Sequence, residues 1–224
     1  MTTPSMHALT LYIGNKNLSS WSLRVWLFLK HLQLPFEEVQ WLLDTPDFKS
    51  KVTNLGAPPR VPVLKDGALV IWDSLAICEY AIEITGRGLP REHAARAVAR
   101  SASAEMHSGF QALRQAWPMN VCARNRSTPM SDALAQDIAR GQALWASLRS
   151  TYGSAGPWLC GEYCLVDAMF APMVLRFVTY DAVLSPVAQA YVQTTLADPL
   201  LQQWQQAAAL EVRARENSHA EQLR

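Results

Sequence analysis

A predicted β-hairpin in the first third of the chain constrains the fold most strongly. Two runs rich in β-branched residues, 61–65 and 68–72, flank the dipeptide Asp66-Gly67. Asp-Gly between such runs favours a tight turn that joins two antiparallel strands. A helix is expected directly afterwards, over residues 75–82, with Ser74 as its N-cap. The sequence therefore predicts a strand–turn–strand–helix unit here.

The residues before the hairpin predict alternating strands and helices. Leu9–Gly14 and Pro35–Trp41 are strand candidates, and residues 22–32 between them are too long for a strand and free of Gly and Pro. Apolar residues cover most of the circumference of that predicted helix, so we expect it to be buried between two layers. Residues 44–60 contain Pro and Gly and predict a helical turn flanked by loops.

A change of composition near residues 85–90 predicts a linker between two domains. Residues 1–84 form the predicted α/β domain. Residues 91–224 contain Ala-rich helical stretches and no convincing strand, and predict an all-helical domain. The helices expected there cover residues 91–116, 131–151, 164–178, 186–196 and 198–215.

Composition and charge disfavour several classes of protein. The chain of 224 residues has 20 Lys and Arg against 19 Asp and Glu. Such a balance lacks the basic face that nucleic acids or membrane surfaces require. No apolar run approaches the ~18 residues of a membrane span, and residues 1–7 lack the features of a secretory signal. The four cysteines are too few for a disulfide scaffold, so a cytoplasmic protein with reduced thiols is expected. Cys160 and Cys164 have no nearby His, so no metal site is expected.

The order of these motifs resembles the cytosolic glutathione transferases over residues 8–212. A strand leads into a Ser-rich loop that opens a helix, and the Val61–Leu64 hairpin, the pair Asp73-Ser74 and a helical second half follow. Asn17–Val25 is similar to the serine motif of zeta-type and related bacterial members. The resemblance implies a thioredoxin-like N-terminal domain, an all-α C-terminal domain and a homodimer. It also implies glutathione as co-substrate and a small hydrophobic electrophile as second partner.

A serine of this loop is the predicted catalytic residue. Only the thiolate is a good nucleophile, and lowering a thiol pKa of ~8.5 by about two units needs roughly 2.7 kcal/mol of preference for the anion. A helix N-terminus provides ~0.3–2 kcal/mol and a hydrogen bond to a charged acceptor ~1.5–3. By position in the motif we predict Ser19, with Ser20, Ser22 and Tyr12 as alternatives. The competing interpretation is that the serines only cap the helix and that Tyr12 packs on the sheet.

The resemblance also implies a set of glutathione-binding residues. Val61-Pro62 matches the cis-proline step of the family, where backbone groups pair with the bound tripeptide. Asp73-Ser74 falls where the family holds the γ-glutamyl end, although the same pair is typical of an ordinary helix cap. Arg60 and Lys49 are candidates for the glycyl carboxylate, with a solvated surface charge as the alternative.

The resemblance also implies that the region of residues 91–116 helps to form the pocket for the second substrate. Four candidates for this pocket share one helical face: Met106, Phe110, Arg114 and Trp117. Packing in the core is the alternative interpretation of their spacing. Trp21 of the serine motif is a fifth candidate for the pocket. His107 is expected on the same helix, in a surface role. Further along, residues 161–168 resemble the capping box of the family, with Cys164 at the cap and Asp167 three residues later.

Three activities fit these motifs. The main prediction is a glutathione transferase that adds the sulfur of glutathione to an electrophile, as a detoxification enzyme does. The first alternative is a glutathione-dependent cis–trans isomerase similar to maleylacetoacetate isomerase, in which glutathione is not consumed. The second alternative is a binding module that keeps the fold without catalysis. No cysteine occurs among residues 15–24, which disfavours thiol–disulfide exchange.

Overall fold

The computed structural model describes residues 8–43 and 45–222. Residues 1–7, Asp44 and residues 223–224 lie outside the described residues, and so do the predictions made for them, including the expected lack of a secretory signal. Among the described helices, none combines the length and the apolar character that crossing a membrane requires.

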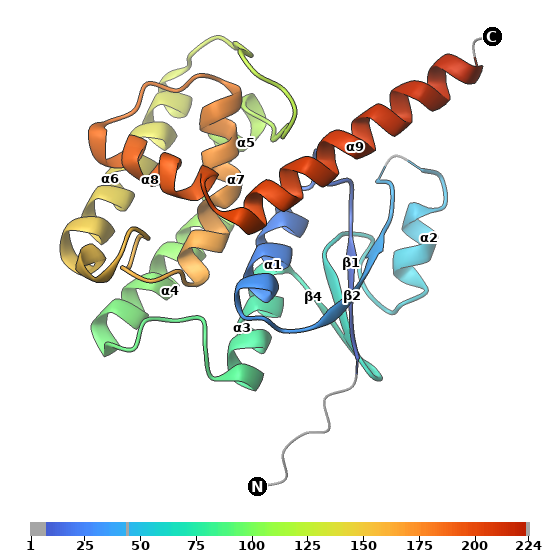
Figure 1. Ribbon diagram of the computed structural model, residues 1–224, viewed down its shortest axis with the longest axis horizontal. Coiled ribbons are helices and arrows are strands. Elements are labelled where there is room, and N and C mark those ends of the chain that lie inside the picture. The colour runs from blue at the N-terminus through green and yellow to red at the C-terminus, as the bar shows by residue number, and fades with distance from the viewer. Residues whose placement is uncertain (1–7, 44, 223–224) are drawn as a thin grey trace, which may run out of the picture.

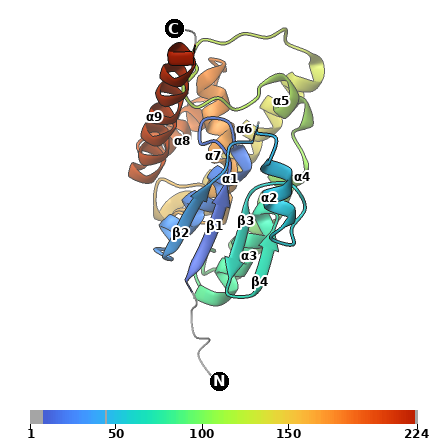
Figure 2. The ribbon, with the colours of Figure 1, turned by 90° about the vertical axis from the view of Figure 1, so that its right-hand side faces the viewer.

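A mixed sheet of four strands forms the N-terminal part, in the order β2-β1-β3-β4 (Figure 2). β1 pairs in parallel with β2 and antiparallel with β3, and β3 pairs antiparallel with β4. The predicted hairpin is confirmed, with Gly67 at a φ of 55° in the turn between β3 and β4. The strands span β1 (Leu9–Ile13), β2 (Phe36–Gln40), β3 (Val63–Asp66) and β4 (Leu69–Trp72).

Helices cover both faces of this sheet (Figure 1). α1 (Ser20–His31) and α3 (Ser74–Thr85) lie between the sheet and the C-terminal helices, and the short α2 (Phe48–Thr53) lies on the opposite face. α1 is buried from Leu23 to Leu29, as its apolar circumference predicts. It begins two residues earlier than predicted, because Ser19 provides the cap. The α/β arrangement expected from the sequence is confirmed.

The C-terminal part is helical, as predicted. Residues 86–92 join α3 to α4, and the domain boundary at residues 85–90 stays a proposal. The last helix extends to Gln222, further than the expected end at Arg215. The helices are α4 (His93–Ser108), α5 (Gln111–Ala116), α6 (Asp132–Tyr152), α7 (Leu165–Thr179), α8 (Pro186–Leu196) and α9 (Pro199–Gln222).

The single helix predicted over residues 91–116 is wrong, because the chain turns between α4 and α5. Phe110 adopts a φ of 58° in the left-handed region, which ends the helical path. The turn directs its ring into the core, where it packs edge-on against Phe170 at 6.1 Å between ring centroids. Burial of an aromatic side chain therefore outweighs the helical preference of the surrounding Ala-rich sequence.

α7 is the central helix of the C-terminal part, and a buried carboxylate closes its N-terminus. The Asp167 oxygens accept hydrogen bonds from the N–H groups of Leu159 and Cys164, at 3.1 and 3.0 Å, and from the Tyr191 hydroxyl at 3.1 Å. The capping box expected from the sequence is present, with Cys164 at its cap. Burial nevertheless dominates and raises the pKa of Asp167 to about 6.

This raised pKa predicts a pH-dependent stability that replacement by Asn removes. Because folded Asp167 binds its proton more tightly than the unfolded chain does, its contribution to stability falls as pH rises through 6. Between about pH 5 and 7 we expect the unfolding free energy of the natural protein to fall by about 1 kcal/mol relative to Asp167→Asn. Urea unfolding of both proteins at each pH measures the difference. A constant difference would contradict the raised pKa.

Candidate active site

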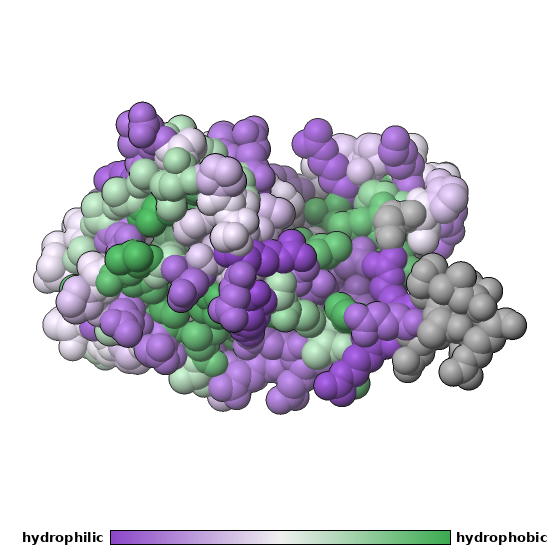
Figure 3. Space-filling model, turned by 90° about the horizontal axis from the view of Figure 1, so that it is seen from above, coloured by the Kyte–Doolittle hydropathy of each residue, from purple (hydrophilic) through white to green (hydrophobic). Residues whose placement is uncertain are grey.

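A cavity of about 1040 Å³ lies where the N-terminal part meets helices α4, α5 and α7. Seen from above, the surface is hollowed between the larger helical side and the side that carries the sheet, with apolar residues at the hollow (Figure 3). Most residues predicted for the site line this cavity: Ser19, Ser20, Trp21, Arg60, Val61, Pro62, Asp73, Ser74 and Arg114. The structure therefore brings together the serine loop, the start of the hairpin and the start of α3.

Hydrogen bonds fix the serine loop at the N-terminus of α1. Ser19 is the N-cap, and its Oγ accepts from the Ser22 N–H at 3.3 Å. The Oγ atoms of Ser19 and Ser22 are hydrogen-bonded at 2.8 Å, and the Ser22 Oγ also accepts from the Gly14 N–H at 3.1 Å. Ser22 is fully buried behind the loop and does not line the cavity, whereas Ser19 and Ser20 do. The helix N-terminus and two hydroxyl groups thus meet at one wall of the cavity.

Asp73 and Ser74 lie at the start of α3. The prediction that Ser74 caps this helix is wrong, because the Asp73 Oδ1 accepts from the N–H groups of Leu75 and Ala76 at 2.9 and 3.2 Å. Asp73 takes this position with a φ of 77°. The buried Ser74 Oγ has no hydrogen-bond partner, although Ser74 lines the cavity. An orphaned hydroxyl in the first turn of a helix is a suitable place for a ligand carboxylate.

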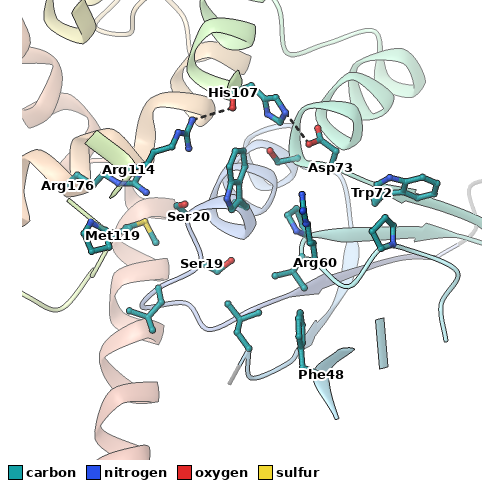
Figure 4. A pocket seen from close by; sticks show the side chains of 18 residues that line it. Ser19, Ser20, Phe48, Arg60, Trp72, Asp73, His107, Arg114, Met119 and Arg176 are labelled. Atoms are coloured by element: carbon teal, nitrogen blue, oxygen red, sulfur yellow. Dashed lines mark hydrogen bonds and ion pairs between the residues drawn. The ribbon is translucent and has the colours of Figure 1, made fainter. Parts of the chain in front are cut away.

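His107 lines the cavity, contrary to the surface role expected for it. Its Nε2 lies 3.1 Å from the Asp73 Oδ2, so α4 contacts the start of α3 (Figure 4). Its ring meets the Trp21 ring edge-on at 5.3 Å between centroids. Burial lowers the pKa of His107, which favours the neutral ring. His107 is half-buried and lies one helical turn after the buried Ser103.

Two arginines lie against the Trp21 ring and a third, Arg176, lines the same cavity. Sequence analysis singled out only Arg114 among the three. The Arg24 and Arg114 guanidinium carbons lie 4.3 and 4.8 Å from the centroid of the Trp21 ring. Arg176 comes from the last turn of α7, is 4% exposed and lines the cavity. Burial, followed by repulsion from Arg114, lowers the pKa of Arg176 to about 9. Burial and the other two guanidinium groups also lower the pKa of Arg24.

The remaining predicted site residues lie away from the cavity lining. Tyr12 packs against Trp41 at 4.8 Å between ring centroids, as its alternative interpretation states. Lys49 is exposed on α2. The structure also corrects the placement of three residues at the second-substrate pocket, because they are buried in the hydrophobic core: Met106, Phe110 and Trp117. Core packing, the alternative interpretation of their helical spacing, describes their position.

Two further features of the sequence have a defined place. The Val61-Pro62 peptide bond is cis, in agreement with the family motif. Cys160 and Cys164 are both buried next to the start of α7. Within residues 8–43 and 45–222, no group of three or more His, Cys, Asp or Glu side chains is arranged to hold a metal ion.

Comparison with known proteins shows similarity to glutathione S-transferases. Residues 18–84 match the family model "Glutathione S-transferase, N-terminal domain". Rat maleylacetoacetate isomerase is 29% identical over 79% of this chain and 81% of its own length. Glutathione S-transferase 1 of Dianthus caryophyllus is 28% identical over 80% of this chain and 81% of its own length. Among solved structures, a Burkholderia glutathione transferase homolog with bound glutathione is 25% identical, with a TM-score of 0.69 over 90% of this chain and 98% of that one.

The N-terminal family match, the relatives along most of the chain and the shared architecture agree with one another. The chain is therefore similar to the glutathione S-transferases in its N-terminal part, along most of its sequence and in its architecture.

Proposed function

We propose that the protein is a glutathione transferase that uses Ser19 to keep the sulfur of bound glutathione ionised. The observation that carries this proposal is the position of the Ser19 hydroxyl. Ser19 lines the cavity at the N-terminus of α1. The thiolate attacks an electrophilic carbon, a sulfur–carbon bond forms, and the leaving group departs with its bonding electron pair. With an aryl chloride the products are the thioether and chloride.

The cavity offers complementary groups for the ends of glutathione. The N-terminus of α3 and the unpartnered Ser74 Oγ are suited to the γ-glutamyl carboxylate, and the Asp73 carboxylate to the adjacent ammonium. The backbone of Val61, just before β3, is suited to pair with the peptide of the ligand. Arg60, which lines the cavity, is the candidate for the glycyl carboxylate. Lys49 lies outside the lining, so we give it no role.

The buried Ser22 supports the catalytic role of Ser19. The Ser19 hydroxyl donates to the Ser22 Oγ, which also accepts from the Gly14 N–H. Both groups are hydroxyls that can rotate, so the Ser22 hydroxyl can donate to the Ser19 Oγ instead when the Ser19 proton turns to the sulfur of glutathione. The Ser19 Oγ would then accept from both the N–H and the hydroxyl of Ser22. This hydrogen bond and the positive end of α1 together match the roughly 2.7 kcal/mol that two units of thiol pKa require.

Replacement of Ser19 by Ala is expected to raise the thiol pKa of bound glutathione by about 1–2 units, since a hydrogen bond to an anion contributes ~1.5–3 kcal/mol. Turnover of chlorodinitrobenzene at neutral pH should fall by about 3- to 25-fold as the thiolate fraction falls, while glutathione still binds. Thiolate absorbance across a pH titration measures the pKa, and calorimetry measures the binding.

Ser185→Ala is the matched control, because Ser185 caps α8 through the same 3.3 Å contact with a backbone N–H and does not line the cavity. We expect it to leave the thiol pKa unchanged. If the thiol pKa of bound glutathione is unchanged in Ser19→Ala but raised in Ser20→Ala or Tyr12→Phe, the catalytic role belongs to Ser20 or Tyr12 instead.

The similarity to rat maleylacetoacetate isomerase supports a second candidate function. In a glutathione-dependent isomerase the thiolate adds to a conjugated double bond and leaves again after rotation about the carbon–carbon bond. The same Ser19 would stabilise the same thiolate, so the geometry of the serine loop serves both reactions.

The fate of glutathione separates the two candidates. For a transferase we expect one glutathione to be consumed for each molecule of electrophile converted. Parallel assays of free thiol and of product on a conjugated cis-alkene and on chlorodinitrobenzene measure this ratio. Conversion of the alkene without loss of thiol, with no thioether formed from the aryl chloride, would favour the isomerase.

We further propose a cytoplasmic homodimer with a role in detoxification. The resemblance to the family supports the dimer and the role, and the four free cysteines support a reducing compartment. The exposed Leu69 and Trp72 on the edge strand β4 are compatible with a partner surface. Sedimentation of the purified chain measures its oligomeric state.

A further inference from the structure

The wall of the cavity around Trp21 carries an excess of positive charge. Among the described residues, Arg24, Arg114 and Arg176 make no ion pair with a carboxylate. Arg24 is fully buried, and none of its guanidinium nitrogens has a hydrogen-bond partner. The Nη1 of Arg176 is also buried without a partner. Buried guanidinium groups that repel one another are costly unless an anion compensates them.

Backbone carbonyl groups hold the two arginines that reach the cavity. The Arg114 Nε donates to the Gly109 carbonyl at 2.9 Å, and its Nη2 donates to the carbonyls of Met106 and His107. The Arg176 Nε donates to the Trp117 carbonyl at 2.8 Å. These contacts orient the guanidinium groups without neutralising their charge. Charged donors that are already held in place are preorganised to bind an anion.

The nearby acids are committed elsewhere. Asp137, which favours the charged form of Arg114, has its Oδ2 occupied by the Leu113 N–H at 2.9 Å. Asp73, which favours the charged form of Arg24, caps α3 and contacts His107. Neither carboxylate forms an ion pair with Arg24, Arg114 or Arg176.

The arginines also lie apart from the groups proposed for glutathione. In Figure 4, Arg114 and Arg176 stand with Met119 on one side of Ser20, while Arg60 and Asp73 stand on the other side. Both carboxylates of glutathione are accounted for at the Arg60 and Ser74 side. The compensating anion therefore belongs to the molecule that occupies the other side, beyond the serine loop.

We propose that the second substrate is an electrophile that carries a carboxylate, held by Arg114 and Arg176. The inference rests on the proposed function and refines its neutral, hydrophobic electrophile to an anionic one. A carboxylate matches the planar fork of a guanidinium and accepts two hydrogen bonds at once. Trp21 and Met119 supply the apolar surface for the body of the molecule. The carboxylate end thus fixes the electrophilic carbon next to the sulfur at Ser19.

A matched pair of probes tests this proposal: chlorodinitrobenzoate, which carries a carboxylate, and neutral chlorodinitrobenzene. For each protein we take the ratio of kcat/KM for the carboxylated probe to that for the neutral one. Arg114→Gln is expected to lower this ratio about tenfold or more relative to the natural protein, and Arg114→Lys to lower it less. Arg140→Gln is the control, since Arg140 pairs with Glu105 outside the cavity lining, and its ratio should not change.

Binding of unreactive analogues provides a second readout that does not need turnover. With S-methylglutathione present, dinitrobenzoate should bind more tightly than dinitrobenzene by calorimetry, and Arg176→Gln should abolish that preference. Thermal unfolding shows whether each variant is folded. An unchanged ratio in Arg114→Gln with equal binding of the two analogues would overturn the proposal.

A raised thiol pKa in Arg114→Gln without a change in the ratio would also overturn it, because the arginines would then serve the thiolate. Failure of the proposed function gives a different result. Neither aryl chloride is then converted, and glutathione does not bind, whether or not dinitrobenzoate binding depends on Arg114 and Arg176.

Discussion

The packing of α1 between the sheet and α7 is the constraint on which the site depends. Apolar side chains on all sides of α1 are buried, including Leu23 and Leu27, so the helix cannot rotate or slide without exposing them. The Gly14 N–H donates to the Ser22 Oγ and ties the end of β1 to the first turn of the helix. Because the axis and the first turn are both fixed, the hydroxyl of Ser19 and the positive helix end point at one place in the cavity.

The parts of the fold that sequence predicts are those that local chemistry determines. The Asp66-Gly67 turn, the apolar circumference of α1 and the helical periodicity of the second half are readable within a few neighbouring residues. The break before α5 is different, because the left-handed backbone of Phe110 is compensated by the burial of its ring against Phe170 in α7. The local sequence pattern around Phe110 does not show a contact with a residue sixty positions away.

The same distinction separates the predicted site residues from the missed ones. Ser19, Val61 and Asp73 lie in contiguous motifs, so a resemblance identifies them before the fold is known. His107 and Arg176 reach the cavity from α4 and α7, and each stands alone in an otherwise unremarkable helical stretch. Arg176 in particular follows a run of apolar residues that indicates only a buried helix. The role of Arg176 in the cavity depends on its tertiary contact with Trp117 and on its proximity to Arg114.

The two buried charges of α7 show how structural and functional polar groups differ in one helix. Asp167 at its N-terminus accepts three hydrogen bonds, so the protein itself satisfies the carboxylate. Arg176 in the last turn is favoured by the negative end of the helix dipole, yet one of its buried nitrogens has no partner. Both residues lie in the same core, so the difference does not come from burial alone. The N-terminal end of α7, where the buried carboxylate is fully hydrogen-bonded, closes the fold. At the other end Arg176 lines the cavity, where the carboxylate of the proposed substrate would provide the missing partner.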